Sequence, residues 1–108
     1  MTALHVSRPT HGSSPGVVAV AGDLDVASAA GFVEAVAAEF QASDSMVLDL
    51  AGVTFLDSTG LGALIELRNG AVGRGGRFSV RNPSSAVERV LSLVGMSDYF
   101  QADEAGAE

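Results

Sequence analysis

The residues best placed to do chemistry lie in the stretch Asp57-Ser58-Thr59-Gly60-Leu61, where an apolar segment gives way to a helical pattern. Ser58 is therefore expected at the N-terminus of a helix, where exposed backbone N–H groups and the helix dipole favour an anion. A serine at such a position is most often a helix cap, and it can also be a modification or binding site. A phosphate on Ser58 would add about −1.5 to −2 charges. We expect it to change what the surface binds and to leave the domain folded.

Ser58 is not expected to be a catalytic nucleophile. The residues around it do not match Gly-x-Ser-x-Gly, and no histidine that could act as a base is near it in the sequence. The two histidines, His5 and His11, lie in the N-terminal segment, and the chain has no cysteine. A Ser-His-Asp triad, a cysteine nucleophile and a histidine or thiolate metal site are therefore disfavoured. We expect a protein that is not an enzyme and has no metal ion or cofactor of its own.

Two other motifs have weaker claims to a function. The acids of Gly22-Asp23-Leu24-Asp25 could bind a cation, but a solvated turn with a capping aspartate is the favoured interpretation. A glycine cluster can hold phosphate, but Gly73-x-Gly75-Gly76 follows a helical pattern. A P-loop precedes its helix and carries Lys-Ser or Lys-Thr. This cluster is interpreted as a helix stop and a turn.

Four strands and three helices are predicted to position these motifs. Strand patterns cover residues 3–6, 17–21, 46–50 and 77–81, and helical periodicity covers about 27–41, about 59–72 and a segment that begins near Ser85. Gly22 is expected to end the second strand, and Gly52 is expected to mark a turn after the third. Strands that alternate with helices indicate a single α/β domain with helices packed on a mixed sheet.

Local signals refine the ends of the helices. Asp25 or Ser28 is available to cap the first helix, and Ser85-x-x-Glu88 matches a capping box at the start of the third. Gly95 suits the C′ position after that helix. The apolar faces are predicted from helical spacing as Phe32, Val33, Val36 and Phe40, then Leu61, Leu64, Ile65 and Val72, then Val87, Val90, Leu91 and Val94.

Composition excludes several classes of protein. A length of 108 residues suits one domain, and 47% hydrophobic with 18% charged residues is a globular balance. Thirteen acidic residues against six arginines give a net charge of −7, which disfavours binding to nucleic acid or to an anionic membrane. The chain has no apolar run near the ~20 residues of a membrane span and no secretory signal pattern. We therefore expect a cytoplasmic protein.

Three segments carry a resemblance to a known family. The turn at Gly22–Ala29 matches the pattern G-[ED]-L-D-x-x-[ST]-A, and Val47–Gly62 matches a signature strand, loop and helix start that contains D-S-[ST]-G-L. Residues 75–83 and 87–100 match a fourth strand and a last helix. Together they resemble a STAS domain of the bacterial anti-sigma factor antagonist type. The match covers about residues 15–100 of a single domain at 1–108, with a weakly ordered acidic tail expected at about 102–108.

The resemblance implies a fold and a mechanism. The fold is a four- or five-stranded mixed sheet with helices packed on one side. The mechanism is partner switching, in which the unphosphorylated protein binds an anti-sigma factor and frees the sigma factor. The anti-sigma factor is a serine kinase with a histidine-kinase-like ATP fold. That kinase would phosphorylate Ser58 and release the protein, and a metal-dependent serine phosphatase would reset it. Thr59 is the second choice as phosphosite, since many relatives have serine or alanine there.

The resemblance also implies a partner-binding surface built from both motifs: Asp23, Asp57, Ser58, Thr59, Gly60 and Leu61. Two alternatives stay open. Some small STAS proteins bind the ATPase of an ABC transporter in bacterial lipid transport, and others form domains of anion transporters. The second alternative is a scaffold that is not phosphorylated, which the intact Asp57-Ser58 pair disfavours.

Overall fold

The computed structural model describes residues 2–7, 17–40 and 45–100. In these ranges the chain forms β1 (His5–Ser7), β2 (Val17–Leu24), α1 (Ala29–Glu39), β3 (Ser45–Leu56), α2 (Ser58–Gly73), β4 (Arg77–Arg81) and α3 (Ser85–Leu93). This is the order of strands and helices that the sequence predicts. His11 and the acidic tail expected at 102–108 lie outside the described residues.

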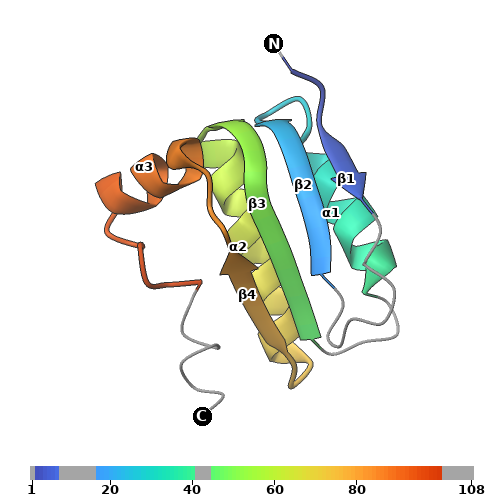
Figure 1. Ribbon diagram of the computed structural model, residues 1–108. Coiled ribbons are helices and arrows are strands. Elements are labelled where there is room, and N and C mark those ends of the chain that lie inside the picture. Colours follow the sequence, from blue (N-terminus) through green and yellow to red (C-terminus); the bar gives the residue numbers. More distant parts are fainter. Residues whose placement is uncertain (1, 8–16, 41–44, 101–108) are drawn as a thin grey trace.

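The strands form one mixed sheet in the order β1-β2-β3-β4, which confirms the predicted fold class. β1 runs antiparallel to β2, whereas β2, β3 and β4 run parallel to one another. Parallel neighbours need a crossover connection. α1 and α2 provide the two crossovers on one face of the sheet, and α3 packs beside the upper part of β3, beyond the end of β4 (Figure 1).

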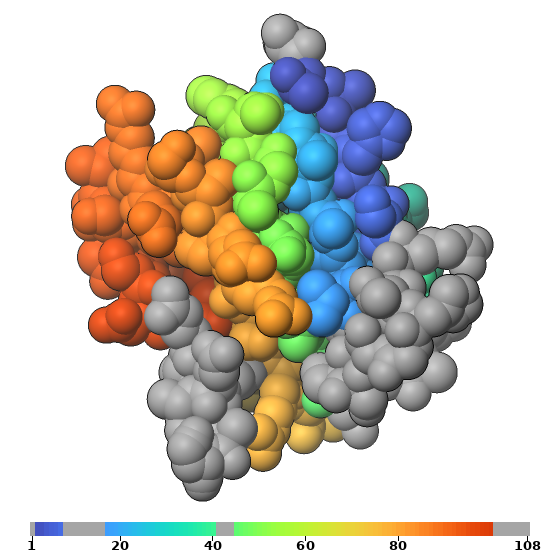
Figure 2. Space-filling model, viewed as in Figure 1, coloured from blue at the N-terminus to red at the C-terminus, as the bar shows by residue number. Residues whose placement is uncertain are grey.

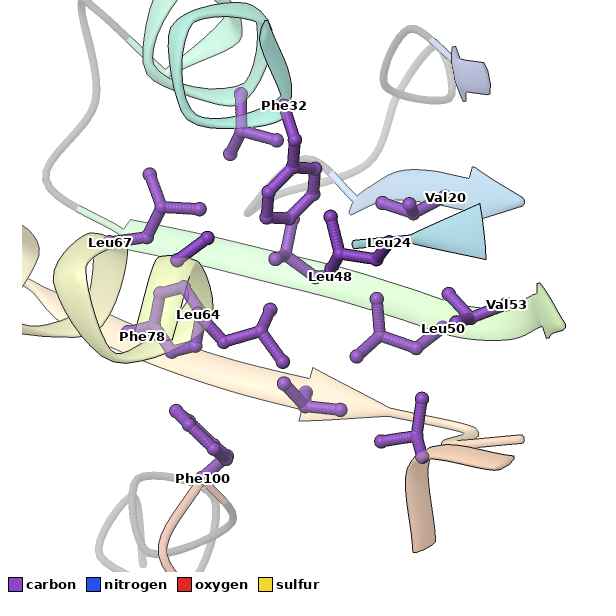
Figure 3. Close-up of a cluster of buried hydrophobic side chains, with 14 of the residues drawn as sticks. Val20, Leu24, Phe32, Leu48, Leu50, Val53, Leu64, Leu67, Phe78 and Phe100 are labelled. Atoms are coloured by element: carbon purple, nitrogen blue, oxygen red, sulfur yellow. The ribbon is translucent and has the colours of Figure 1, made fainter. Parts of the chain in front are cut away.

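The core lies between the sheet and the two helices that cover it. Burial alternates along β2, where Val18 and Val20 are buried and Ala19 and Ala21 are exposed. This is the period-two pattern of a strand with one covered face. Leu64 of α2 is fully buried among the strand side chains (Figure 3). The described helices leave the opposite face of the sheet open, and side chains of β2 and β3 reach the surface there (Figure 2).

The segment after α3 closes one side of the core. Phe100 is 1% exposed, and its ring centroid lies 5.7 Å from that of Phe78 on β4 (Figure 3). The Val80 N–H donates to the Phe100 carbonyl at 3.2 Å. Arg68 of α2 stacks on Tyr99, with its guanidinium carbon 4.5 Å from the ring centroid. These contacts fix the end of the described chain against β4 and α2.

Two glycines that are predicted to end a strand or to follow one lie inside strands. Gly22 has a φ of +105°, and a Cβ there would lie 2.1 Å from the carbonyl oxygen of Ala3. A Cβ on Gly52 would lie 2.8 Å from the Cβ of Ala21 on the neighbouring strand. The predictions of a strand end at Gly22 and a turn at Gly52 are wrong, because a glycine inside a strand can mark a close approach of two backbones.

The start of α3 also differs from the prediction. Its N-cap is Ser84, whose hydroxyl oxygen accepts the Val87 N–H at 3.2 Å. The capping box predicted at Ser85 is therefore one residue late, because either serine can cap and the backbone decides which one does. Gly95 has a φ of +74°, which agrees with its predicted C′ position. No helix in the described ranges is long and apolar enough to cross a membrane.

Two valines predicted to face the core are exposed. Val72 near the end of α2 is 46% exposed, because the buried face of the helix continues from Leu67 to Ala71. Val94 is 51% exposed and is the C-cap of α3, where the chain leaves the helix. Both errors fall at helix ends, where periodicity alone does not show which turn still contacts the sheet.

Candidate functional site

The two motifs lie side by side at the edge of the sheet where β2 and β3 end, at the upper end of both strands in Figure 1. Leu24 pairs in register with Leu56, and each is the last residue of its strand. The N–H of Asp57 donates to the Leu24 carbonyl at 3.4 Å, which joins the β3–α2 junction to the end of β2. Binding sites of α/β folds commonly lie at the C-terminal ends of parallel strands.

Asp57 is the N-cap of α2. Its backbone is extended, with φ −113° and ψ −174°, and its Oδ1 accepts the Gly60 N–H at 2.8 Å. Ser58 is the first residue of the helix and is exposed. Its side chain makes no hydrogen bond to any residue that the structure describes, so the interpretation of Ser58 as a cap is wrong. Thr59 follows it on the helix and is also exposed.

Gly60 and Leu61 lie beneath this surface. A Cβ on Gly60 would lie 2.3 Å from the Leu24 carbonyl oxygen and 2.8 Å from Cδ1 of Leu56. Only a glycine therefore lets the first turn of α2 approach the end of β2 so closely. Leu61 is 9% exposed and belongs to the core. Both residues support the site from below, and their contact with a partner stays a prediction.

Hydrogen bonds close the turn between β2 and α1. Oδ1 of Asp25 accepts the N–H groups of Ala27 and Ser28, at 3.1 and 3.2 Å. The Ser28 hydroxyl accepts the Asp25 N–H at 3.0 Å and donates to the Asp23 carbonyl at 2.9 Å. Ser28 occupies the N-cap position of α1, but its side chain caps no N–H of the helix. Asp25 is thus the side chain that closes the turn. The favoured interpretation of this motif, a solvated turn with a capping aspartate, is wrong for Asp23 and Leu24, which lie in β2, and the N–H groups that Asp25 accepts precede α1.

The Asp23 carboxylate lies beside this turn and is held by two donors. Oδ1 accepts the Thr54 hydroxyl at 2.6 Å, and Oδ2 accepts the Thr2 N–H at 3.0 Å. The hydrogen bond from Thr54, followed by that from Thr2, lowers the pKa of Asp23 below its ordinary value of 3.8, because both donors favour the charged form. Asp23 is therefore an anion at neutral pH. The sequence analysis did not find Thr54 or Thr2, since no local pattern reports a contact that depends on strand register.

Four polar residues at this edge form what we call the Ser58 surface: Asp23, Asp57, Ser58 and Thr59. Two of them carry carboxylates and none is basic, so the surface is acidic. Across the described ranges, no group of three histidine, aspartate or glutamate side chains is placed to hold a metal ion. The surface therefore offers two hydroxyls beside two carboxylates.

An open groove between α1 and α2 continues from Thr59. It is lined by Val26, Ala29, Ala30, Val33, Thr59, Gly62, Ala63 and Glu66. Val26 is 75% exposed. The sequence analysis missed this groove, because its shape depends on how two helices sit beside each other.

Comparison with known proteins places this geometry in a family. The family model described as "Mlab, STAS domain" matches residues 7–101. A solved anti-sigma factor antagonist from Mycobacterium paratuberculosis has a TM-score of 0.74 and 27% identity, over 91% of this chain and 83% of that one. A candidate anti-sigma factor antagonist from Thermotoga maritima has a TM-score of 0.65 and 31% identity, over 74% and 72% of the two chains. A STAS-domain containing protein from Pseudomonas aeruginosa is 36% identical over 55 residues, and the match spans only 54% of that protein's length.

Proposed function

We propose that this chain, which belongs to the STAS domain family, is an anti-sigma factor antagonist that acts by partner switching. In its unphosphorylated form the Ser58 surface binds an anti-sigma factor, and the sigma factor is released. The anti-sigma factor is a serine kinase with a histidine-kinase-like ATP fold, and a metal-dependent serine phosphatase reverses its action. This function requires a protein in the cytoplasm, where sigma factors meet RNA polymerase.

The observation that carries this proposal is the exposed hydroxyl of Ser58 at the first position of α2, which has no hydrogen-bond partner among the described residues. Because Asp57 already caps the helix, Ser58 has no structural duty that a phosphate would disrupt. The kinase transfers the γ-phosphoryl group of ATP to Oγ of Ser58, ADP leaves, and the hydroxyl proton passes to a base of the kinase. Thr59 is equally exposed and is the second choice as acceptor.

Electrostatics explain why a phosphate would release the partner without unfolding the domain. The N–H groups of Ser58 and Thr59 are in the first turn of α2 and donate to no acceptor among the described residues. These donors and the helix dipole stabilise a phosphate in place. The same phosphate adds about −1.5 to −2 charges to a surface that already carries Asp23 and Asp57, which disfavours an interface fitted to the unmodified surface.

A paired capture experiment tests the proposal. Ser58→Ala and Ser58→Asp proteins serve as baits in a lysate of the cell that makes the protein, with Thr59→Ala as the matched control at the neighbouring exposed hydroxyl. We expect a histidine-kinase-like serine kinase on the Ser58→Ala and Thr59→Ala baits and its loss from the Ser58→Asp bait. Incubation of the wild-type protein with the captured kinase and ATP should then place phosphate on Ser58, which mass spectrometry of the peptides would locate.

Other outcomes of the same experiment decide against partner switching. An ABC-transporter ATPase held equally by both Ser58 baits would favour an accessory subunit of a transporter. The same set of other proteins on both baits would favour a scaffold that does not respond to phosphorylation.

A further inference from the structure

A bulge in β3 lies directly beside Asp23. The register pairs Gly22 with Val53 and the next residue, Asp23, with Phe55, so Thr54 is an extra residue on β3 at this point. Such bulges re-aim a side chain and are frequent next to functional sites. Here the extra residue donates its hydroxyl to Oδ1 of Asp23 at 2.6 Å.

The N-terminal segment holds Asp23 through backbone atoms. The Thr2 N–H donates to Oδ2 of Asp23 at 3.0 Å, and the Asp23 N–H donates to the Thr2 carbonyl at 3.0 Å. This approach depends on Gly22, because any Cβ there would collide with the carbonyl of Ala3. Each carboxylate oxygen of Asp23 is thus held by a different donor from a different segment.

We infer that Thr54 is a positioning residue, which fixes the Asp23 carboxylate on the Ser58 surface so that a partner meets an anion already held in place. The inference rests on the proposed function, since it requires that the partner contact Asp23. A side chain that is fixed before binding does not have to be ordered at the interface. Without the Thr54 hydroxyl, the Asp23 carboxylate would keep the hydrogen bond from the Thr2 N–H and lose the one to Oδ1. The side chain of Asp23 would then rotate more freely.

The first test needs no partner. Thr54→Val removes the hydroxyl and keeps the branched shape, and Thr54→Ser keeps the hydroxyl and removes the methyl group. The pKa of the Asp23 carboxyl, followed by NMR, should rise in Thr54→Val and stay at the wild-type value in Thr54→Ser. Because Thr54 is exposed, neither change should prevent folding, and the thermal unfolding of each variant checks this. An unchanged pKa in Thr54→Val would overturn the inference.

The second test measures affinity for the kinase captured with the Ser58→Ala bait. Thr54→Val should weaken binding about two- to tenfold, whereas Thr54→Ser should bind like the wild type. In an Asp23→Asn background, Thr54→Val should cause no further loss, since the effect passes through the carboxylate. Two results would contradict a positioning role. One is that Thr54→Val leaves the affinity unchanged, and the other is that it weakens binding as much in the Asp23→Asn background as in the wild type. Equal capture by both Ser58 baits would instead overturn the proposed function, and the NMR titration would still decide whether Thr54 holds Asp23.

Discussion

Asp57 is the residue of the motif that fixes where α2 begins. Its carboxylate accepts the Gly60 N–H at the start of α2, and the next side chain, that of Ser58, makes no hydrogen bond within the described part of the chain. A structural cap and a candidate phosphate acceptor therefore occupy neighbouring positions. The two residues act together, because the Asp57 cap fixes the position of Ser58 at the start of α2.

The capping role of Asp57 can be separated from its charge. Asp57→Ala should lower the free energy of unfolding by about 0.5–2 kcal/mol, because the Gly60 N–H loses its acceptor. Asp57→Asn keeps an acceptor oxygen and should retain most of the wild-type stability while removing the charge. Urea unfolding monitored by circular dichroism measures both. If the two variants lost stability equally, the charge and not the cap would be what the helix requires.

At the scale of elements, the close contact between α2 and the end of β2 sets the shape of the site. This contact is made by Gly60, the residue after the exposed Thr59, against the backbone of Leu24. Gly62, two residues further along the same helix, faces open space instead. The packing of the helix thus requires the glycine at position 60 and does not require the glycine at position 62.

These two glycines make a matched pair. Gly60→Ala should lower the free energy of unfolding by about 1–3 kcal/mol, because the new Cβ would overlap the Leu24 carbonyl and push the helix away. Gly62→Ala should raise it by about 0.5–1 kcal/mol, since alanine favours a helix and nothing lies in its way. Chemical denaturation of both variants checks the sign of each effect. Tolerance of alanine at position 60 would argue against the close contact.

Periodicity and motifs predicted the type and order of every element described, and they placed Asp57 and Ser58 at a helix start. They could not place Thr54 beside Asp23, because the bulge exists only as a mismatch between two strands far apart in sequence. They also misjudged Gly22 and Gly52, which look like breaks in a single sequence. Both lie inside paired strands, and neighbouring backbone and side-chain atoms occupy the space that a side chain would need there.

At the scale of the whole molecule, Asp23 joins three segments. Through its carboxylate and backbone it links Thr2 before β1, its own strand β2 and Thr54 on β3. The stability of this end of the sheet should therefore depend on the charge of one carboxyl group.

Acid titration tests that dependence. The folded-state pKa of Asp23 lies below 3.8, so the stability that its charge provides is complete above about pH 5 and is lost as the pH falls through the folded-state value. The free energy of unfolding of the wild type should thus fall relative to that of Asp23→Asn, whose side chain does not titrate. The difference between the two proteins, measured from pH 6 downward, removes the contribution of the other acids. A difference that stays constant into the acid range would show that the carboxylate is not held as described.

The close contact of Asp57 and Gly60 with Leu24 also has a consequence for how related proteins diverge in the partners they bind. It is made by backbone atoms, by a residue with no side chain and by the Asp57 cap, so it does not depend on which exposed side chains lie beside it. Under the proposed function, substitutions at exposed positions nearby, such as Thr59 and Val26, would alter which partner is recognised while Ser58, the proposed acceptor, keeps its place. Duplicated copies of one gene could therefore acquire separate partners within the same cell, and cross-talk between them would be reduced by surface changes alone.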